Sequence, residues 1–212
     1  MTNQGLLRAL ALLLPLSACH EDDLAGAGIE IPADDVILTG DPTPVVPPRI
    51  TSGPTKVTSE TCTVCGGDCR AEQLDYDSWH HIPSGVALDY ENAPPAGGDH
   101  DPCWAVWGVH DEVLEARHWV HNLEHGGVVF LYDCPAGCPD EIDTLEQLVA
   151  SLPNWALLTR FPGLQRRFDV LSANHRLLMD CVDEAALTSF YETNKGHSTE
   201  SITSGPPAQC LP

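Results

Sequence analysis

The clearest hydrophobic patterns lie in the second half of the chain. The uninterrupted apolar run Val128–Tyr132 has strand length and predicts a strand buried on both faces. Residues 139–152 repeat apolar side chains at helical spacing, with acidic residues at the start, and predict an amphipathic helix. Residues 111–125 also have helical spacing, and Gly126 stands where a helix commonly ends.

Shorter patterns complete the expected fold. They predict one more helix and four more strands: a helix at 183–194 and strands at 86–90, 155–161, 168–173 and 176–182. The last two strands would form a hairpin across Asn174-His175, and Asp183 would cap the final helix. Prolines and glycines place residues 92–98 in a loop. The order β-α-β-α-β-β-β-α predicts an α+β fold, a single domain with a mainly antiparallel sheet and helices packed on one face.

The N-terminal region is different in kind. Residues 1–19 combine a short segment carrying Arg8 with an apolar stretch, which predicts an export signal too short to span a membrane. Its ending, Leu16-Ser17-Ala18-Cys19, resembles a bacterial lipobox, in which Cys19 becomes the lipid-bearing first residue. An ordinary cleaved signal with an incidental Cys19 is the alternative. His20 stands where an aspartate would favour inner-membrane retention, so the resemblance implies a lipid anchor in the bacterial cell envelope, at the outer membrane.

Residues 20–60 carry acidic residues and then prolines, without a sustained apolar period. Such a stretch cannot bury enough surface to offset the entropy cost of ordering, so we expect a disordered tether. The globular domain is expected at 61–212, a length that suits one domain with a real core. The formal net charge of −21 repels phosphate backbones and argues against nucleic-acid binding. It would attract divalent cations.

Nine cysteines are present, and eight remain in the mature chain if Cys19 is lipidated. An even number in an exported protein predicts a disulfide-stabilised domain, although the pairing cannot be deduced from the sequence. The alternative for Cys62, Cys65 and Cys69 is a thiolate zinc site or a redox motif.

The segment His121-Asn122-Leu123-Glu124-His125 fits the H-x-x-E-H pattern of the inverted zinc peptidases. On a helix the two imidazoles lie about 40° apart on one face and can reach one ion. Glu124 is close enough to be a ligand or to orient an imidazole. A metal there would lie near the helix C-terminus, whose negative dipole end favours a cation. The alternative is that one histidine caps helix carbonyls while the other packs in the core.

Four quoted stretches resemble the family known as domain of unknown function 3105: "HIPSGVALDYENAPPAGGDH", "WAVWG", "WVHNLEHGGVVFLY" and "MDCVDEAALTSFYETNKGHSTESI". The similarity covers about residues 79–202, and the H-x-L-E-H-G core is its most specific part. The chain departs from the family pattern at Ala93, Gly97 and Asp101, and Cys103 is an addition. The resemblance implies a set of site residues, without a reaction: His81, His100, His121, Glu124 and His125.

Imidazoles combined with one carboxylate suit zinc or copper(II). A thioether copper(I) site is disfavoured because the only methionines are Met1 and Met179. Three functions remain open: a lipoprotein whose metal is structural or handled as cargo, a zinc hydrolase with Glu124 as general base, and an interaction domain whose histidines only hydrogen-bond. Five other histidines are expected at the surface or away from the site: His80, His110, His118, His175 and His197.

Overall fold

The computed structural model describes residues 56–62, 67–90, 94–152, 154–198 and 200. The expected signal peptide, the lipidated Cys19 and the tether up to residue 55 lie outside the described residues. The sheet already includes Lys56, so regular structure begins five residues before the expected boundary at 61. No helix in the described part of the chain is long and apolar enough to cross a membrane.

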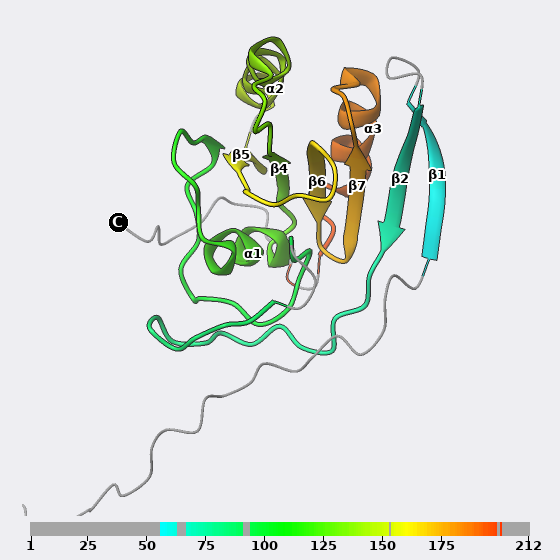
Figure 1. The fold of residues 1–212 in the computed structure, drawn as a ribbon. Coiled ribbons are helices and arrows are strands. Elements are labelled where there is room, and N and C mark those ends of the chain that lie inside the picture. The colour runs from blue at the N-terminus through cyan, green and yellow to red at the C-terminus, as the bar shows by residue number, and fades with distance from the viewer. Residues whose placement is uncertain (1–55, 63–66, 91–93, 153, 199, 201–212) are drawn as a thin grey trace, which may run out of the picture. The chain divides into compact units, whose positions relative to one another are not determined.

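Seven strands form one mixed sheet in the order β1-β2-β7-β6-β4-β5-β3, with the β1–β2 ribbon beside β7 (Figure 1). Their bounds are β1 Lys56–Cys62, β2 Gly67–Gln73, β3 Gly108–Val109, β4 Val128–Tyr132, β5 Ala156–Arg160, β6 Phe168–Ser172 and β7 His175–Met179. All neighbours are antiparallel except β4–β5 and β5–β3, which are parallel. The predicted α+β class with a mainly antiparallel sheet is confirmed.

Three helices accompany the sheet: α1 Ala116–Glu124, α2 Pro139–Ser151 and α3 Glu184–Asn194. The predicted cap of α3 is confirmed, since the Asp183 carboxylate accepts hydrogen bonds from the backbone N–H groups of Ala185 and Ala186. Helix α1 starts later than predicted. The preceding residues are held by β5 instead, because the Thr159 hydroxyl accepts from the Leu114 N–H and donates to the Glu112 carbonyl.

The expectation that the helices share one face of the sheet is wrong. Val128 and Phe130 of β4 pack in a core with α2 and α3, whereas Val129 and Leu131 pack in a second core with α1. Alternate residues of a strand point to opposite faces, so a central strand that is apolar at every position needs cover on both. The apolar run that predicted the strand therefore required helices on both sides.

Two other local predictions differ from the structure. Residues 86–90 form no strand; the Arg117 guanidinium donates to the Val86 carbonyl, so a side chain replaces a ladder bond there. Strands β1 and β2 were not predicted, because their sequences lack apolar alternation. These two strands are held by antiparallel pairing of their backbones, β1 with β2 and β2 with β7.

Disulfides are found at every described cysteine: Cys62, Cys69, Cys103, Cys134, Cys138 and Cys181. Cys62 pairs with Cys69, and Cys134 pairs with Cys138 across the start of α2. The first pair argues against the alternative of a thiolate zinc site at Cys62, Cys65 and Cys69, since oxidised sulfurs do not ligate zinc.

Candidate metal centre

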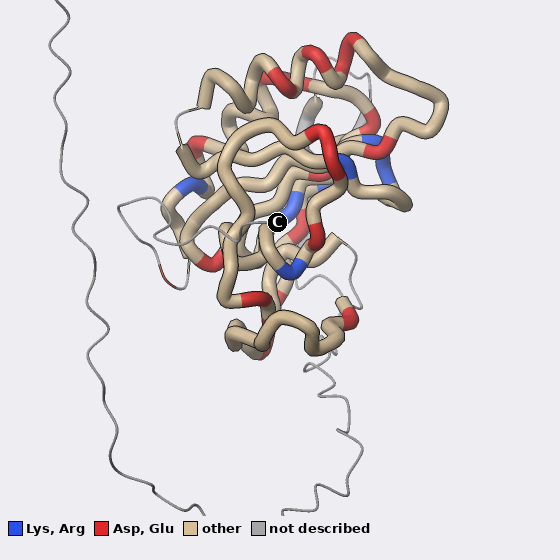
Figure 2. The backbone as a smooth tube through the Cα atoms, turned by 90° about the vertical axis from the view of Figure 1, so that its left-hand side faces the viewer, with Lys and Arg blue, Asp and Glu red and all other residues tan. Residues whose placement is uncertain are grey.

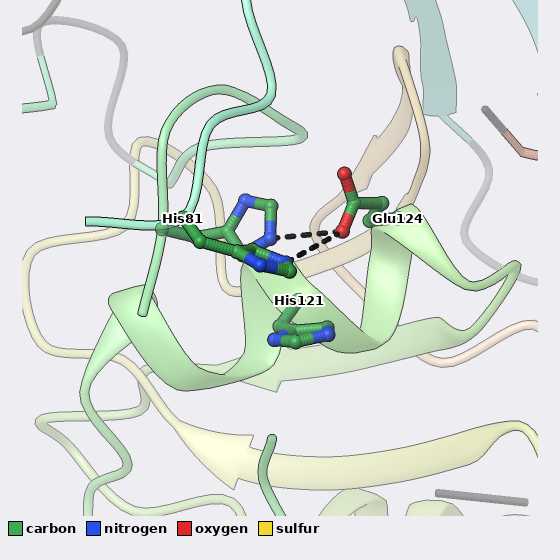
Figure 3. Close-up of side chains that lie close together, drawn as sticks. His81, His121 and Glu124 are labelled. Carbon is green, nitrogen blue, oxygen red and sulfur yellow. Dashed lines mark hydrogen bonds and ion pairs between the residues drawn. The ribbon is translucent and has the colours of Figure 1, made fainter. Parts of the chain in front are cut away.

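The candidate centre lies where the last turn of α1 meets two loop segments that run side by side (Figure 3). Helix α1 supplies His121 and Glu124, and His125 is its C-cap residue. The loops supply His81 and His100, which form an isolated β-bridge. Backbone hydrogen bonds from the Ile82 N–H to the His100 carbonyl (2.7 Å) and from the His100 N–H to the His80 carbonyl (3.0 Å) fix this parallel bridge. Residues from three segments are thus locked around one point.

Four side chains offer donor atoms that lie within 4.8 Å of one another: His81, His100, His121 and Glu124. The Glu124 Oε2 atom lies 3.0 Å from His100 Nε2 and 3.3 Å from His81 Nε2. In a tetrahedral zinc site with ligand bonds of 2.0–2.1 Å, donors are spaced about 3.3 Å apart. Three donors are buried and only His81 is exposed, its side chain by 49%. The set has the donor composition of a transition-metal site, and its two contacts at Glu124 are close to the spacing of zinc ligands.

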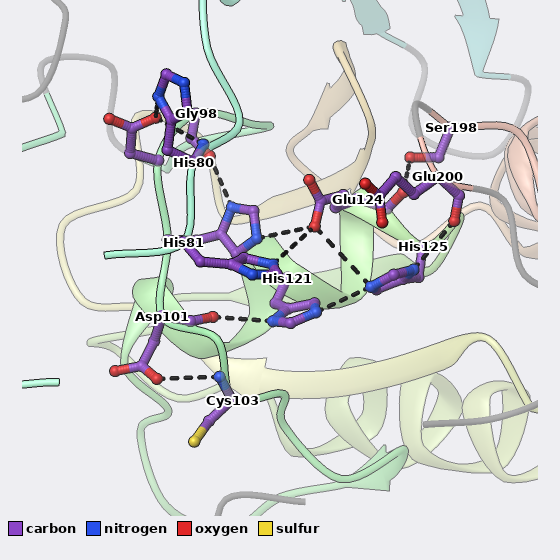
Figure 4. A network of polar contacts seen from close by, with 12 residues as sticks. His80, His81, Gly98, Asp101, Cys103, His121, Glu124, His125, Ser198 and Glu200 are labelled. Carbon is purple, nitrogen blue, oxygen red and sulfur yellow. Dashed lines mark hydrogen bonds and ion pairs between the residues drawn. The ribbon is translucent and has the colours of Figure 1, made fainter. Parts of the chain in front are cut away.

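The imidazole tautomers follow from the backbone around the rings (Figure 4). The Nδ1 atoms of His100, His121 and His125 lie 2.9 Å, 2.9 Å and 3.0 Å from the backbone carbonyls of Gly98, Asp101 and Glu200. Because a carbonyl only accepts, each Nδ1 must carry the proton and donate it. In the neutral ring the lone pair then belongs to Nε2, which in His100 lies 3.0 Å from Glu124 Oε2. Such a hydrogen bond is the usual partner of a metal-ligating histidine.

His125 occupies a different place from the one expected. Its Nε2 lies 2.9 Å from His121 Nε2 and 3.9 Å from Glu124 Oε2. It is not one of the four convergent donors; it belongs instead to a second group with Glu124 and Glu200. The predicted site residues are therefore all neighbours, but they divide between two groups that share Glu124.

The electrostatics of the centre favour cation binding. Burial, together with the neighbouring imidazoles of His100 and His125, lowers the pKa of His121 to about 4, so this ring is neutral at neutral pH. Burial acts to raise the pKa of Glu124, but the contact with His100 and the adjacent imidazoles outweigh it and hold that pKa below its usual value. Glu124 is thus an anionic oxygen donor among nitrogen donors.

Trp104 is a site residue that the sequence reasoning missed. Its buried indole stacks on His125, with ring centroids 4.2 Å apart and planes 7° apart, and on His121 at 4.8 Å and 21°. The stack fixes the orientation of both imidazoles and keeps water from that side. The only sequence signal was its place in the "WAVWG" segment.

Asp101 is a second site residue that the sequence reasoning missed, and its role is to hold a loop in place. Its carboxylate accepts from the Ser84 hydroxyl (2.7 Å) and the Cys103 N–H (3.0 Å), and it pairs with Arg117 at 3.2 Å. These contacts hold the loop whose carbonyl accepts from His121 Nδ1. The departure from the family pattern at this residue thus supports the centre.

The other histidines of the described residues lie outside both donor groups: His80, His110, His118, His175 and His197. The side chain of His80 is 75% exposed, as expected for a surface residue. The side chain of His110 is only 13% exposed, and its Nε2 atom lies 2.7 Å from the Val106 carbonyl, outside the centre. His118 lies on the same helix stripe as His121 but approaches Asp101 (4.0 Å) instead of the donors.

The fold and the site define the class of protein: a mixed α+β domain whose first helix ends in a buried cluster of imidazoles and a carboxylate. A comparison with known protein families identifies the family. Residues 81–209, more than half of the chain, match the model of "Protein of unknown function (DUF3105)", and the protein belongs to that family. The suspected resemblance is confirmed. No curated protein and no solved structure shows a significant match.

Proposed function

We propose that the protein is a lipoprotein of the bacterial cell envelope whose α+β domain binds a transition metal, zinc or copper(II), as a structural ion or as cargo. One observation carries the metal site: backbone carbonyls hold the Nδ1 protons of His100 and His121, which leaves the Nε2 lone pairs of two buried rings for a cation. These rings belong to a group of four donors that lie within 4.8 Å of one another. Three nitrogens and one carboxylate oxygen suit both metals.

A cation accounts for contacts that would otherwise each need a separate proton. The Nε2 atoms of His121 and His125 lie 2.9 Å apart, and His100 Nε2 lies 3.0 Å from Glu124 Oε2. With every Nδ1 already donating, each of these contacts repels unless a ring takes a second proton or a metal lies between the donors. One divalent ion bound by His100, His121 and Glu124 would engage a lone pair at each of these contacts, and His125 need not be one of its ligands. The interaction-domain hypothesis instead needs imidazolium rings in a buried cluster, which burial disfavours.

The hydrolase hypothesis has less support than the binding hypothesis. A general base must be free to take a proton from a metal-bound water. Here Glu124 Oε2 is in contact with both His100 and His81, which is the position of a metal ligand and not of a free base. In addition, α1 ends at Glu124, so His125 follows the helix instead of lying within it.

The test is the metal content of the purified protein after equilibration with zinc or copper(II) and removal of free ion. Wild type is expected to retain bound metal, and His100→Ala and His121→Ala are expected to lose most of it, because each removes one of four donors. The melting temperature of wild type should rise with metal and that of the variants should not, since ligand loss removes binding free energy from the folded state.

His175→Ala is the matched control, because His175 belongs to neither donor group. It should bind metal as wild type does. Circular dichroism would confirm that each variant is folded before its metal is measured. Equal, sub-stoichiometric metal in all four proteins would reject the metal site and favour hydrogen-bonding histidines.

The proposed location rests on the N-terminal segment, where Leu16-Ser17-Ala18-Cys19 resembles a lipobox. The several acyl chains of a lipoprotein would anchor it, since a lone chain binds a membrane only marginally. We expect the full-length protein to fractionate with membranes and Cys19→Ala to be released or left unprocessed. Unchanged processing and membrane association of Cys19→Ala would reject the lipid anchor while leaving the metal site untouched.

A further inference from the structure

We infer that a second divalent cation binds beside the first, held by Glu124, His125 and Glu200, with Glu124 shared between the two ions. This inference rests on the proposed metal site. Its basis is the second group of donors, whose atoms also lie within 4.8 Å of one another. Glu200 lies 75 residues after His125 in the chain, and the fold brings the two together.

Glu200 is held in place by its backbone (Figure 4). Its N–H donates to the Glu124 carbonyl (3.2 Å), and its own carbonyl accepts from His125 Nδ1 (3.0 Å). Two residues earlier, the Ser198 hydroxyl donates to the same Glu124 carbonyl. Ser198 and Glu200 therefore both bind the Glu124 carbonyl, one of those that a helix C-terminus leaves without intrahelical partners. The backbone of an exposed glutamate is thus fixed beside the buried cluster, and its carboxylate lies within 4.8 Å of the donor atoms of Glu124 and His125.

His125 has one ring atom available for this ion. With Nδ1 occupied by the Glu200 carbonyl, the Nε2 lone pair remains, 3.9 Å from Glu124 Oε2 and 2.9 Å from the Nε2 atom of His121 in the first group. The indole of Trp104 lies parallel to the ring and prevents it from turning away. His125 was the one predicted ligand that the first group left out, and the second group gives it a role.

The two positions differ in chemistry. The first offers three nitrogens and one oxygen, whereas the second offers one nitrogen and two carboxylates and so accepts harder ions such as manganese(II) as well as zinc. In two-metal sites the ions lie about 3.5–4 Å apart and commonly share a ligand. The second ion should bind more weakly, because it meets the charge of the first and one of its ligands, Glu200, is exposed.

The experiment is a calorimetric titration of the metal-free protein with zinc, with bound zinc measured after dialysis. Wild type is expected to bind two equivalents in two steps of different affinity. Glu200→Gln and His125→Ala should each bind one equivalent and keep the tighter step. Glu184→Gln, which alters an exposed glutamate of α3, is the matched control and should still bind two.

The outcomes separate this inference from the proposed function. One equivalent in wild type, unchanged in Glu200→Gln, would overturn the second ion and leave the first site standing. No bound zinc in wild type would overturn both. Because Glu200 is exposed and its fixed contacts are made by the backbone, Glu200→Gln should fold normally, which keeps the comparison interpretable.

Discussion

Replacing Gly126 by alanine is expected to lower the free energy of unfolding by about 2–4 kcal/mol. Gly126 follows the C-cap of α1 with φ +87°, a conformation that costs other residues about 1–2 kcal/mol. A Cβ there would lie 2.7 Å from Gly196 Cα and 2.9 Å from its carbonyl carbon, closer than packed atoms approach. The Gly196 N–H also donates to the Gly126 carbonyl at 2.8 Å. Backbone must therefore move to admit a single methyl group.

Gly137→Ala is the matched control for this prediction. Gly137 has φ +85°, but a Cβ there meets no atom within 4 Å. Alanine at this position should cost only the backbone strain, about 1 kcal/mol, partly offset by a less flexible unfolded chain. Chemical denaturation of both variants gives the comparison, and equal losses would show that the contact with Gly196 is not what constrains Gly126.

Gly126→Ala should also affect the metal centre. Gly196 begins the segment that continues to Ser198 and Glu200, which bind the end of α1. Pushing Gly196 away would displace Glu200 and leave His81, His100 and His121 in place. Gly126→Ala is therefore expected to weaken binding of the second zinc ion more than the first.

The largest pH effect on stability is expected from Asp169, on β6. Both carboxylate oxygens are buried and lack a hydrogen-bond partner among the described residues, and the cross-strand neighbours are Leu131 and Leu178. Burial raises the pKa of Asp169 from 3.8 to about 7. Arg176 acts to lower this pKa, and Glu72, with which the Arg176 guanidinium is paired, acts to raise it.

A carboxyl whose pKa is higher in the folded state stabilises the protein while it is protonated. This contribution is fully present below pH 3.8 and is lost as the pH rises through about 7, since ionising a buried, unpaired carboxylate favours unfolding. The free energy of unfolding of Asp169→Asn, relative to wild type, should therefore increase by roughly 2–4 kcal/mol between pH 4 and pH 8.

Chemical denaturation of both proteins across this pH range measures their free energies of unfolding. The relevant quantity is how the difference between the two free energies changes with pH, because the desolvation cost of the amide is the same at every pH. Asp143→Asn, at an exposed position on α2, controls for the loss of one negative charge from an acidic protein. Acidic residues are spread over the described chain and line α2 (Figure 2). A difference that stays constant from pH 4 to pH 8 would show that Asp169 ionises normally in the folded state.

Some elements could be predicted because their signals are local. Strand β4 matches its apolar run residue for residue, α2 matches its helical spacing within one residue, and Asp183 caps α3. Strands β1 and β2 carry no such signal, because their partners supply the hydrogen bonds and most of their side chains are polar.

By itself, the sequence determined the helix spacing that puts His121 and Glu124 on one turn, the glycine that ends the helix, and the family. These depend on residues a few positions apart, whose geometry is set by the helix itself. Only the tertiary structure decided that helices cover both faces of the sheet, that His125 faces Glu200 across 75 residues, and that carbonyls of two loops hold the imidazole protons. Such contacts depend on how distant segments pack, which local spacing does not encode.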